Sequence, residues 1–275
     1  MKKITVAVSC YHNEEEIKRF AKQLEKQTVH ESITLLVTMN AASSNASQSL
    51  LVSDLDRLDL ETVVSDPGSN LGYLHGAVYS LDKAGISAET EWIVICNTDI
   101  EFASDSFFEQ CLALPTGESV WAVAPLVHLK EENINQNPFM EKRPSNEWIC
   151  QRKRVYSNPL LFTAFLLLAV LKNKHAGKEM VRGVPHTIYA QHGCFFILKP
   201  GFVRQLINDQ NDVFMFGEEL LLAELIRQAG RQIYYYPELE ITHLHTRKAF
   251  SFNNRFKQKC FKQSFNYLYS RFFSE

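Results

Sequence analysis

An aspartate directly behind an apolar run is the residue whose position points most clearly to chemistry. Asp99 follows the run Trp92–Cys96, and Asn97 stands two positions before it. Open α/β sheets bind charged ligands at the carboxyl ends of their strands, and hard divalent cations prefer oxygen ligands. Asn97 and Asp99 are therefore predicted to help hold a cation at a strand end, although the same pattern also occurs in plain turns.

Two neighbouring glutamates are a second candidate for chemistry. Glu218 and Glu219 begin the stretch 218–229, whose leucines repeat at helical spacing. The backbone N–H groups of a helix N-terminus favour an ionised carboxylate, and such a carboxylate can accept a proton from a substrate. From these residues alone, a purely electrostatic role in starting the helix also stays open.

Alternating strands and helices must position these residues. Asn13 with Glu16 resembles a capping box and predicts a helix that continues to Leu24. A tight turn over 67–72 precedes a further helix that ends at Gly85. Apolar runs predict strands at 4–9, 33–38, 60–65, 92–96, 120–127, 191–198 and, stopped by Pro237, 233–236. This alternation predicts an α/β fold with a mainly parallel, doubly wound sheet flanked by helices.

Two stretches are predicted to be irregular. Residues 40–49 are small and polar, which is typical of a loop at a strand end. Residues 128–154 are polar and poor in helix signals, so we expect a mobile loop there.

The composition excludes several classes of protein. The chain has 275 residues, 45% of them hydrophobic and 22% charged, which is typical of a globular protein with a sizeable core. A net charge of -2 argues against general nucleic-acid binding. The six cysteines are scattered without a CxxC pair, so we expect reduced, buried thiols in a cytoplasmic protein. The start, Met1–Ile4, lacks the apolar core of a signal peptide.

Two segments raise the possibility of contact with a membrane. Residues 160–171 form an uncharged run of twelve residues, too short for the roughly 20 that span a bilayer. A buried helix is the preferred interpretation, and a helix lying in the membrane plane is the other. The tail 247–275 combines seven Lys/Arg with nine Phe/Tyr and one acid. It suits an anionic membrane surface and a tail wrapped around its own domain equally well.

The order of the motifs resembles the family 2 glycosyltransferases with the GT-A fold, especially bacterial rhamnosyltransferase-like members. The resemblance runs from Val6 to about His245. It rests on six elements in the correct order, namely Val8–Glu14, Ser69–Tyr73 with Gly76, Cys96–Ile100, Gly193–Ile197, Phe214–Leu220, and Arg227 with Gly230 leading to Pro237 and His243.

The resemblance implies a role for each motif. Asp99 matches the family's aspartate that binds Mg²⁺ or Mn²⁺ on the donor's diphosphate, and His243, preferred over His245, matches a histidine that completes this site. Glu219, or else Glu218, matches the base that deprotonates the acceptor. Positions that contact the nucleotide sugar correspond to Ser9, Tyr11, Asn40, Asn70, Gly72 and Asn97.

Two departures from the family pattern matter. Glu219 stands where the family usually has Asp, which lengthens the side chain by one methylene. After the second strand the family commonly has an acid that reaches the nucleotide, but this chain has Met39 followed by Asn40. Nucleotide recognition is therefore altered or uses Asp66.

The resemblance implies a GT-A domain over 1–246, with a nucleotide-binding half at 1–127 and an acceptor half at 128–246, followed by the basic aromatic tail 247–275. The implied activity is inverting transfer from a dTDP- or UDP-sugar to a glycan or lipid-linked acceptor in bacterial surface polysaccharide synthesis. The implied location is the cytoplasm, with contact to the inner face of the plasma membrane left open.

Two rival functions remain. A degenerate, non-catalytic GT-A module that binds nucleotide sugar or glycan is favoured by Met39 and Glu219. A nucleotidyltransferase is disfavoured because such enzymes need a Gly-rich basic loop early in the chain, whereas Tyr11–Glu16 is acidic.

Overall fold

Alternating strands and helices in the first hundred residues build a parallel sheet in the order β3-β2-β1-β4. The computed structural model describes residues 2–173, 180–244 and 253–274. The strands are β1 (Lys3–Tyr11), β2 (Ile33–Ala41), β3 (Glu61–Ser65) and β4 (Thr90–Cys96), and the helices between them are α1 (Glu14–Glu25), α2 (Asn45–Leu55) and α3 (Tyr73–Ala84), with a short 3₁₀ helix, η1 (His30–Ser32).

The second half of the chain extends the same sheet with mixed pairing. β9 is antiparallel to its neighbours β4 and β6, β10 is parallel to β6, and β5 is antiparallel to β10. The sheet is therefore more mixed than the mainly parallel one predicted. The elements are β5 (Ile100–Phe102), α4 (Phe107–Leu112), β6 (Val120–Leu129), β7 (Ile134–Asn135), β8 (His186–Ile188), β9 (Phe195–Leu198), α7 (Pro200–Ile207), α8 (Glu218–Gln228) and β10 (Gln232–His243).

Helices cover both faces of the sheet, which explains why its central strands are apolar on both sides. Residues of α1, α2 and α4 pack with Val6 and Val94 in one core cluster. Residues of α3, α7 and α8 pack with Ala7 and Ile95, their neighbours in the strands, in a second cluster. Successive strand residues point to opposite faces, so each central strand contributes to both clusters.

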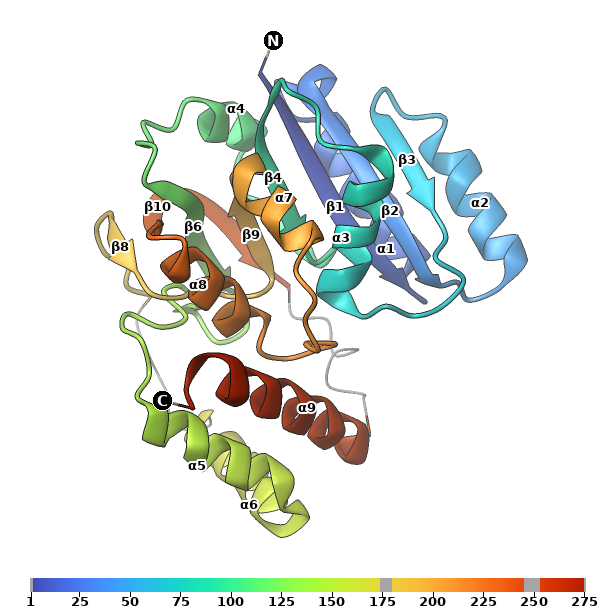
Figure 1. Ribbon diagram of the computed structural model, residues 1–275. Coiled ribbons are helices and arrows are strands. Elements are labelled where there is room, and N and C mark those ends of the chain that lie inside the picture. Colours follow the sequence, from blue (N-terminus) through green and yellow to red (C-terminus); the bar gives the residue numbers. More distant parts are fainter. Residues whose placement is uncertain (1, 174–179, 245–252, 275) are drawn as a thin grey trace.

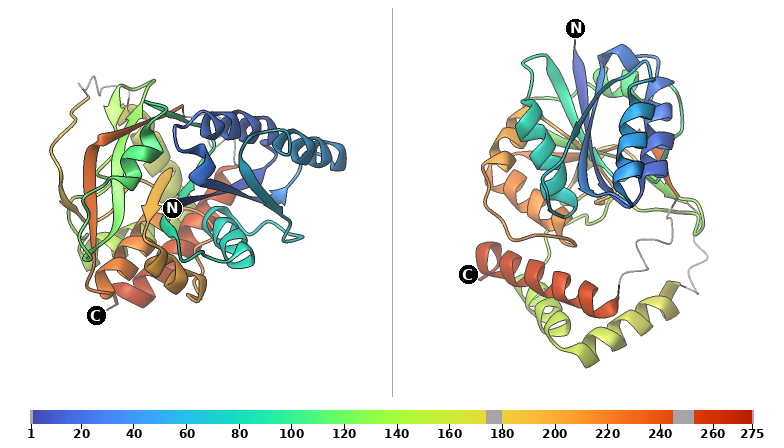
Figure 2. Two further views of the ribbon diagram at one scale, coloured as in Figure 1. Left: turned by 90° about the horizontal axis from the view of Figure 1, so that it is seen from above. Right: turned by 90° about the vertical axis from the view of Figure 1, so that its right-hand side faces the viewer.

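A layer of three helices lies beyond the carboxyl ends of the parallel strands. These are α5 (Asn146–Ser157), α6 (Pro159–Asn173) and α9 (Asn254–Phe272). The arrowheads of β1 and β2 point toward this layer in Figure 1, and the second view in Figure 2 shows it separate from the sheet-covering helices. It leaves the carboxyl edge of the sheet between the core and the helical layer.

The structure corrects four local predictions. α5 begins inside the predicted loop 128–154, with Ser145 as its N-cap, and α2 begins inside the predicted loop 40–49, with Ser44 as its N-cap. β10 continues past Pro237 because a bulge between Tyr236 and Glu240 accommodates it. Asn13 precedes α1, but its side chain makes no capping hydrogen bond.

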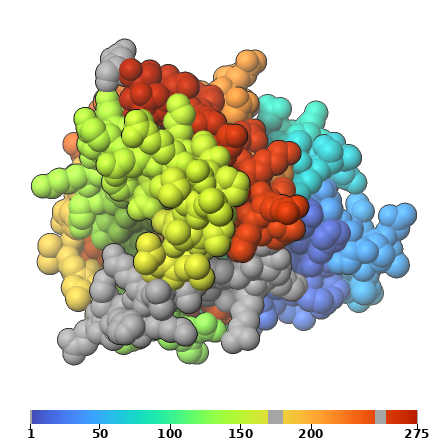
Figure 3. Space-filling model, turned by 90° about the horizontal axis from the view of Figure 1, so that it is seen from below, coloured from blue at the N-terminus to red at the C-terminus, as the bar shows by residue number. Residues whose placement is uncertain are grey.

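The segment 160–171 is helical, but the prediction that it is buried is wrong. In α6, Phe162 is buried, whereas Leu160 is 82% and Leu168 65% exposed, and Leu161 and Leu167 are also exposed. Figure 3 shows α6 on an outer face of the molecule, beside α9. In the part of the chain that the structure describes, no helix combines the length and the apolar character needed to cross a membrane.

The tail packs on its own domain through α9. Phe265 and Leu268 of this helix are buried, and Ser264 Oγ donates a hydrogen bond to the Met215 carbonyl at 3.0 Å. α9 therefore supports the loop that leads into α8. His245 and the tail residues up to 252 lie outside the described residues. Five of the six cysteines are buried and Cys150 is partly buried, as expected for reduced structural thiols.

A buried carboxylate ties α8 to the helical layer. Glu224 accepts hydrogen bonds from Arg143 Nε at 2.8 Å, Arg227 Nη2 at 2.7 Å and Tyr189 Oη at 2.6 Å. Arg143 in turn donates to the Phe272 carbonyl and lies over the Phe273 ring. Burial raises the pKa of Glu224, but the hydrogen bonds from Arg227, Arg143 and Tyr189 outweigh it and hold the pKa below its usual value.

We predict that Glu224→Gln destabilises the fold by about 2–3 kcal/mol, less than the roughly 3–5 kcal/mol for a fully buried pair because both arginines are partly exposed. Because the folded pKa is lowered, the ionised form stabilises the protein above the ordinary carboxyl pKa, and this contribution is lost as the pH falls. Urea unfolding at pH 7 and pH 4 measures both effects. Exposed Glu238→Gln is the control, and an equal loss in both variants would contradict the prediction.

Candidate functional site

The strand-end aspartate and a histidine converge at the carboxyl edge of the sheet. Asp99 follows β4, and His243 is the last residue of β10. Both are nearly buried, and His243 Nε2 lies 3.5 Å from Asp99 Oδ1. The other ring nitrogen, Nδ1, donates to Gln136 Oε1 at 2.8 Å. This bond leaves Nε2 directed at the carboxylate, an arrangement in which both groups can bind one cation.

The donor set fits a divalent cation of the manganese type. A carboxylate oxygen and an imidazole nitrogen point at the same place, and imidazole and carboxylate are both accepted ligands of divalent transition metals. The backbone holds the pair independently of the carboxylate, because the Leu244 N–H donates to the Asp99 carbonyl at 2.9 Å. Asp99 and His243 are the residues that would hold the ion.

A further histidine and a cysteine adjoin this pair. Potential ligand atoms of His192, Cys194 and His243 all lie within 4.8 Å of one another. Burial, together with the charge of Asp99, raises the pKa of the Cys194 thiol well above its usual value, so the thiol is protonated at neutral pH. The sequence analysis missed His192, although its position directly before Gly193 in the motif was a usable signal.

The segment at Gly193 lies between the Asp99–His243 pair and the glutamates of α8. The Asn97 N–H donates to the Cys194 carbonyl at 2.9 Å, and Tyr73 Oη donates to the Gly193 carbonyl at 2.8 Å. A Cβ atom at Gly193 would lie 2.7 Å from Glu219 Oε1. Only glycine lets the Glu219 carboxylate approach the backbone this closely.

The two glutamates at the start of α8 share one strongly desolvated site. Burial and the neighbouring Glu219 charge raise the pKa of Glu218 to about 8. Burial also raises the pKa of Glu219, but backbone hydrogen bonds at its own N–H, Gly217 and Gly193 oppose the rise. The raised pKa values favour the binding of a proton by the pair. Because the backbone hydrogen bonds oppose the rise at Glu219, we assign that proton to Glu218 and the negative charge to Glu219.

The turn that precedes α3 is fixed by the ends of β1 and β2. Asn40 Nδ2 donates to the Gly72 carbonyl at 2.7 Å, and Asn40 Oδ1 accepts from the Leu71 N–H at 3.2 Å. Ser9 Oγ donates to the Tyr73 carbonyl, and Asn70 Oδ1 accepts from the Gly72 N–H. Asn40 and Ser9 therefore position the turn, whereas Asn70 lies on its exposed side.

The remaining predicted residues lie around the same edge. Tyr11 is exposed beside His12, and Asn97 is partly exposed between β4 and Asp99. Asn13 Nδ2 donates to Thr98 Oγ1 at 3.0 Å and so connects the β1 end to this motif. Met39, at the position where an acid was expected, is buried in the core. Asp66 is exposed and accepts a hydrogen bond from the Gly68 N–H within its own turn.

An aromatic pocket opens at the Glu219 side chain. It has a volume of about 370 Å³ and lies among α5, α6, α9 and the start of α8. Phe216, which precedes α8 with a φ of 65°, stacks on Phe261 of α9 with ring centroids 4.3 Å apart. The sequence analysis did not predict this pocket, because its walls come from helices that are far apart in the chain.

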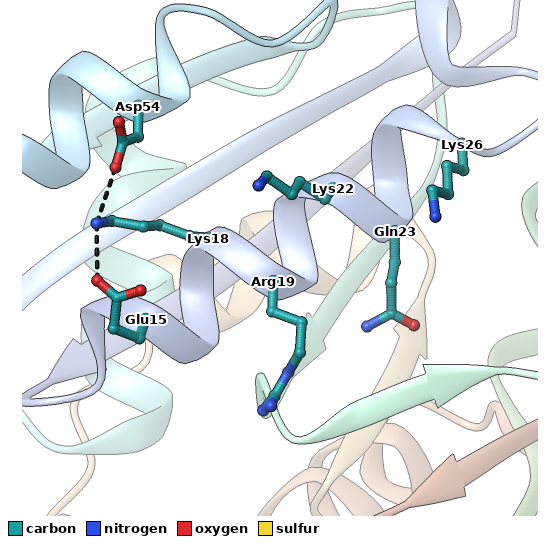
Figure 4. A pocket seen from close by; sticks show the side chains of 7 residues that line it. All are labelled: Glu15, Lys18, Arg19, Lys22, Gln23, Lys26 and Asp54. Atoms are coloured by element: carbon teal, nitrogen blue, oxygen red, sulfur yellow. Dashed lines mark hydrogen bonds and ion pairs between the residues drawn. The ribbon is translucent and has the colours of Figure 1, made fainter.

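A more open hollow of about 460 Å³ lies on the surface formed by α1 and α2. Figure 4 shows Lys18 reaching both Glu15 and Asp54, each at 2.8 Å. The other basic side chains of this hollow, Arg19, Lys22 and Lys26, come from α1 and the residue that follows it. It is an ion-paired helix surface and contains none of the predicted site residues.

Comparison with solved structures identifies the architecture. No protein-family model and no curated protein matches the chain. It is similar to the mannosyltransferase PcManGT from Pyrobaculum calidifontis in complex with GDP-Man and Mn²⁺, with 12% identity and a TM-score of 0.58 over 90% of this chain and 58% of that one. It is also similar to GalNAc-T7 with UDP, GalNAc and Mn²⁺, with 13% identity and a TM-score of 0.59 over 89% and 43%.

The chain has the GT-A fold. The predicted fold class is thereby confirmed. The chain spans only 58% and 43% of the lengths of these two structures. Because the sequence identity is only 12–13%, the similarity to these two structures shows the fold alone.

We predict that Gly72→Ala destabilises the fold. Gly72 has a φ of +83°, and an added Cβ atom would lie 2.2 Å from the Phe214 carbonyl oxygen. With a ψ of -169°, this backbone lies in a region that essentially only glycine occupies, and holding another residue there costs roughly 1–3 kcal/mol. The clash adds to this cost. Gly117→Ala is the matched control, because nothing lies within 4 Å of its Cβ position. Equal urea midpoints for the two variants would contradict the prediction and show that the turn can accommodate a methyl group.

Proposed function

We propose that the chain is a metal-dependent, inverting glycosyltransferase that moves one sugar from a nucleoside-diphosphate donor to a glycan or lipid-linked acceptor. The observation that carries the proposal is the convergence of the Asp99–His243 pair and Glu219 on the segment Gly193–Cys194, at the carboxyl edge of a GT-A sheet. The nucleotide sugar, nucleotide and Mn²⁺ in the two similar structures support this choice.

The donor would occupy the edge formed by residues 1–127. Tyr11, Asn70 and Asn97 surround the exposed part of this edge, while Ser9 and Asn40 fix the turn at Gly72. Mg²⁺ or Mn²⁺ held by Asp99 and His243 would supply positive charge to the diphosphate of a dTDP- or UDP-sugar. The acceptor would enter from residues 128–246, where the aromatic pocket reaches Glu219.

Glu219 would act as the general base. Its ionised carboxylate takes the proton of the acceptor hydroxyl while the hydroxyl oxygen forms a bond to the anomeric carbon. The bond between that carbon and the diphosphate oxygen breaks, and the diphosphate leaves with the electron pair. Attack from the face opposite the leaving group inverts the anomeric centre. Glu218, protonated beside it, would keep the negative charge on Glu219.

A non-catalytic module that binds nucleotide sugar or glycan is the second candidate function. It is favoured by the buried Met39 in place of an expected acid and by Glu219 in place of Asp. Measured hydrolysis or transfer of a nucleotide sugar separates the two candidates, because a binding module gives neither.

The proposed biological role of the enzyme is bacterial surface polysaccharide synthesis in the cytoplasm, at the inner face of the plasma membrane.

We predict that Asp99→Asn abolishes transfer and that EDTA has the same effect on the unaltered protein. The substitution removes a negative ligand, while the backbone bond from Leu244 to residue 99 remains. The measurement is release of nucleoside diphosphate in the presence of Mn²⁺, with thermal unfolding as the test of folding. The control is Glu101→Gln, an exposed acid two residues away. Full activity in EDTA would remove the metal from the mechanism.

We predict that Glu219→Gln lowers kcat by about 10²–10⁴-fold, the usual effect of removing a positioned general base. Donor affinity should stay nearly unchanged, because the carboxylate faces the acceptor pocket. Glu218→Gln should have a much smaller effect at pH 7, because an amide resembles the protonated acid that we assign there. Turnover and donor KM of the three proteins test this, and a larger loss in Glu218→Gln would exchange the two roles.

The pH profile adds a separate readout. Since Glu219 must be ionised to accept a proton, kcat of the unaltered protein should rise with pH through the raised pKa of Glu219. Glu218→Gln should keep this acid limb, and Glu219→Gln should lose it. An acid limb that survives in Glu219→Gln would place the base elsewhere.

A further inference from the structure

The aromatic pocket has a polar floor and an apolar wall, and its shape bears on the acceptor that the proposed transferase uses. Glu219, and Gly217 just before α8, belong to its lining. Phe216 and Phe261 stack at 4.3 Å, and Trp148 and Phe265 lie 6.4 Å apart along the wall. Flat aromatic faces attract the weakly positive C–H groups of a sugar ring. A sugar in this pocket would present a hydroxyl to Glu219.

The lining of the pocket also includes a cation, Arg152. The Arg152 guanidinium lies 4.9 Å from the ring centroids of both Trp148 and Phe165. Among the described residues, no carboxylate forms an ion pair with it, whereas Arg143 and Arg227 are both paired with Glu224. A planar guanidinium is well suited to a phosphate group.

Phe165 connects the pocket to the exposed leucines of α6. It lines the pocket, and Leu161 and Leu168 lie four residues before and three residues after it on the same helix face. Leu161 is exposed and Leu168 is 65% exposed. The apolar wall of the pocket therefore continues as a leucine stripe onto the outer surface, where Figure 3 shows α6 in view.

The helices beside this stripe are strongly basic. α5 carries three Lys/Arg and α9 five, against the single acid Glu147 on the two helices together. Lys153 of α5 lies over the Tyr269 ring of α9 at 4.3 Å. Basic residues beside exposed leucines are typical of a helix that lies on an anionic lipid surface. The charge of the layer therefore complements a phosphate-bearing lipid.

We propose that the acceptor is a sugar joined through a phosphate to a lipid chain, with the sugar in the aromatic pocket, the phosphate at Arg152 and the chain on the leucine stripe of α6. This inference rests on the proposed glycosyl transfer and specifies its acceptor. Going outward from Glu219, the proposed subsites would hold first the sugar, then the phosphate and then the chain. These groups follow one another in the same order in such a molecule, with the reacting hydroxyl on the sugar. The lipid remains in the membrane plane while its sugar reaches the base.

The test uses the full chain and dodecyl phosphate below its critical micelle concentration, measured by calorimetry. Dodecyl phosphate should bind at least tenfold more tightly than both hexyl phosphate and dodecyl glucoside. Arg152→Gln should weaken the binding of dodecyl phosphate at least tenfold, and Arg152→Lys should retain part of this binding. Arg154→Gln, an exposed arginine of the same helix that lies outside this pocket, is the matched control and should change binding less than twofold.

The chain subsite has its own variants. The double variant Leu161→Ser and Leu168→Ser should remove the preference for dodecyl over hexyl phosphate, while Leu50→Ser, an equally exposed leucine on α2, should keep it. Neither surface substitution is expected to change the unfolding temperature. Equal weakening in Arg152→Gln and Arg154→Gln, or an unchanged chain preference in the double variant, would overturn the proposal.

Failure of this proposal and failure of the proposed function give different results. Asp99→Asn should lose the stabilisation by Mn²⁺ with a nucleotide sugar but keep dodecyl phosphate binding, because the two sites use different residues. Transfer to a water-soluble glycan by a protein that does not bind dodecyl phosphate would disprove the lipid acceptor and leave the transferase. Dodecyl phosphate binding with the predicted Arg152 dependence, in a protein without transferase activity, would support the lipid site and contradict the enzyme.

Discussion

The close approach of α8 to the backbone at Gly193 is the constraint on which the site depends. A single methyl group at this position would lie 2.7 Å from the Glu219 carboxylate. The same residue accepts a hydrogen bond from Tyr73, and the next residue holds Asn97 through its carbonyl. One glycine thus brings together the end of β4, the start of α3 and the start of α8, which carry the groups that we propose for the donor and the acceptor.

Helix α8 carries two kinds of desolvated carboxylate, which differ in their hydrogen-bond partners. Glu224 has two arginines and a tyrosine, so it is ionised and structural. Glu218 and Glu219 have each other and the backbone, so burial raises both pKa values. Unpaired buried carboxylates are costly to hold in a fold, and they concentrate at sites where a proton is moved. The desolvated carboxylates of the first turn destabilise α8 locally, while the hydrogen bonds of Glu224 fix the rest of the helix.

The sequence predicted the part of the site that local patterns encode. The strand ends that carry Ser9 and Asp99, the turn at Gly72 and the start of α8 at Glu218 were all correctly placed, because apolar runs and glycines mark them directly. The predicted capping by Asn13 was wrong, because its Oδ1 accepts a hydrogen bond from the Tyr11 N–H while its Nδ2 donates to Thr98, 85 residues away. β10 continues beyond Pro237 because it pairs with β6, and a local sequence pattern does not contain information about this pairing.

The sequence predicted the helix α6 but not the exposure of its leucines, for a physical reason. α6 is apolar around much of its circumference, so its sequence reads as a buried helix. Its outer leucines are instead exposed, and its inner face meets Tyr156 and Phe261 from α5 and α9. A helix that is apolar both toward its domain and toward the outside can satisfy both faces when a lipid surface covers the outer one. The edge that we propose for the donor is built from elements with the apolar pattern of a buried α/β core. The pocket that we propose for the acceptor is built in part from α6, whose pattern does not distinguish a buried helix from one on a lipid surface. That contrast follows if the two substrates arrive from different solvents, the donor from water and the acceptor from a lipid surface.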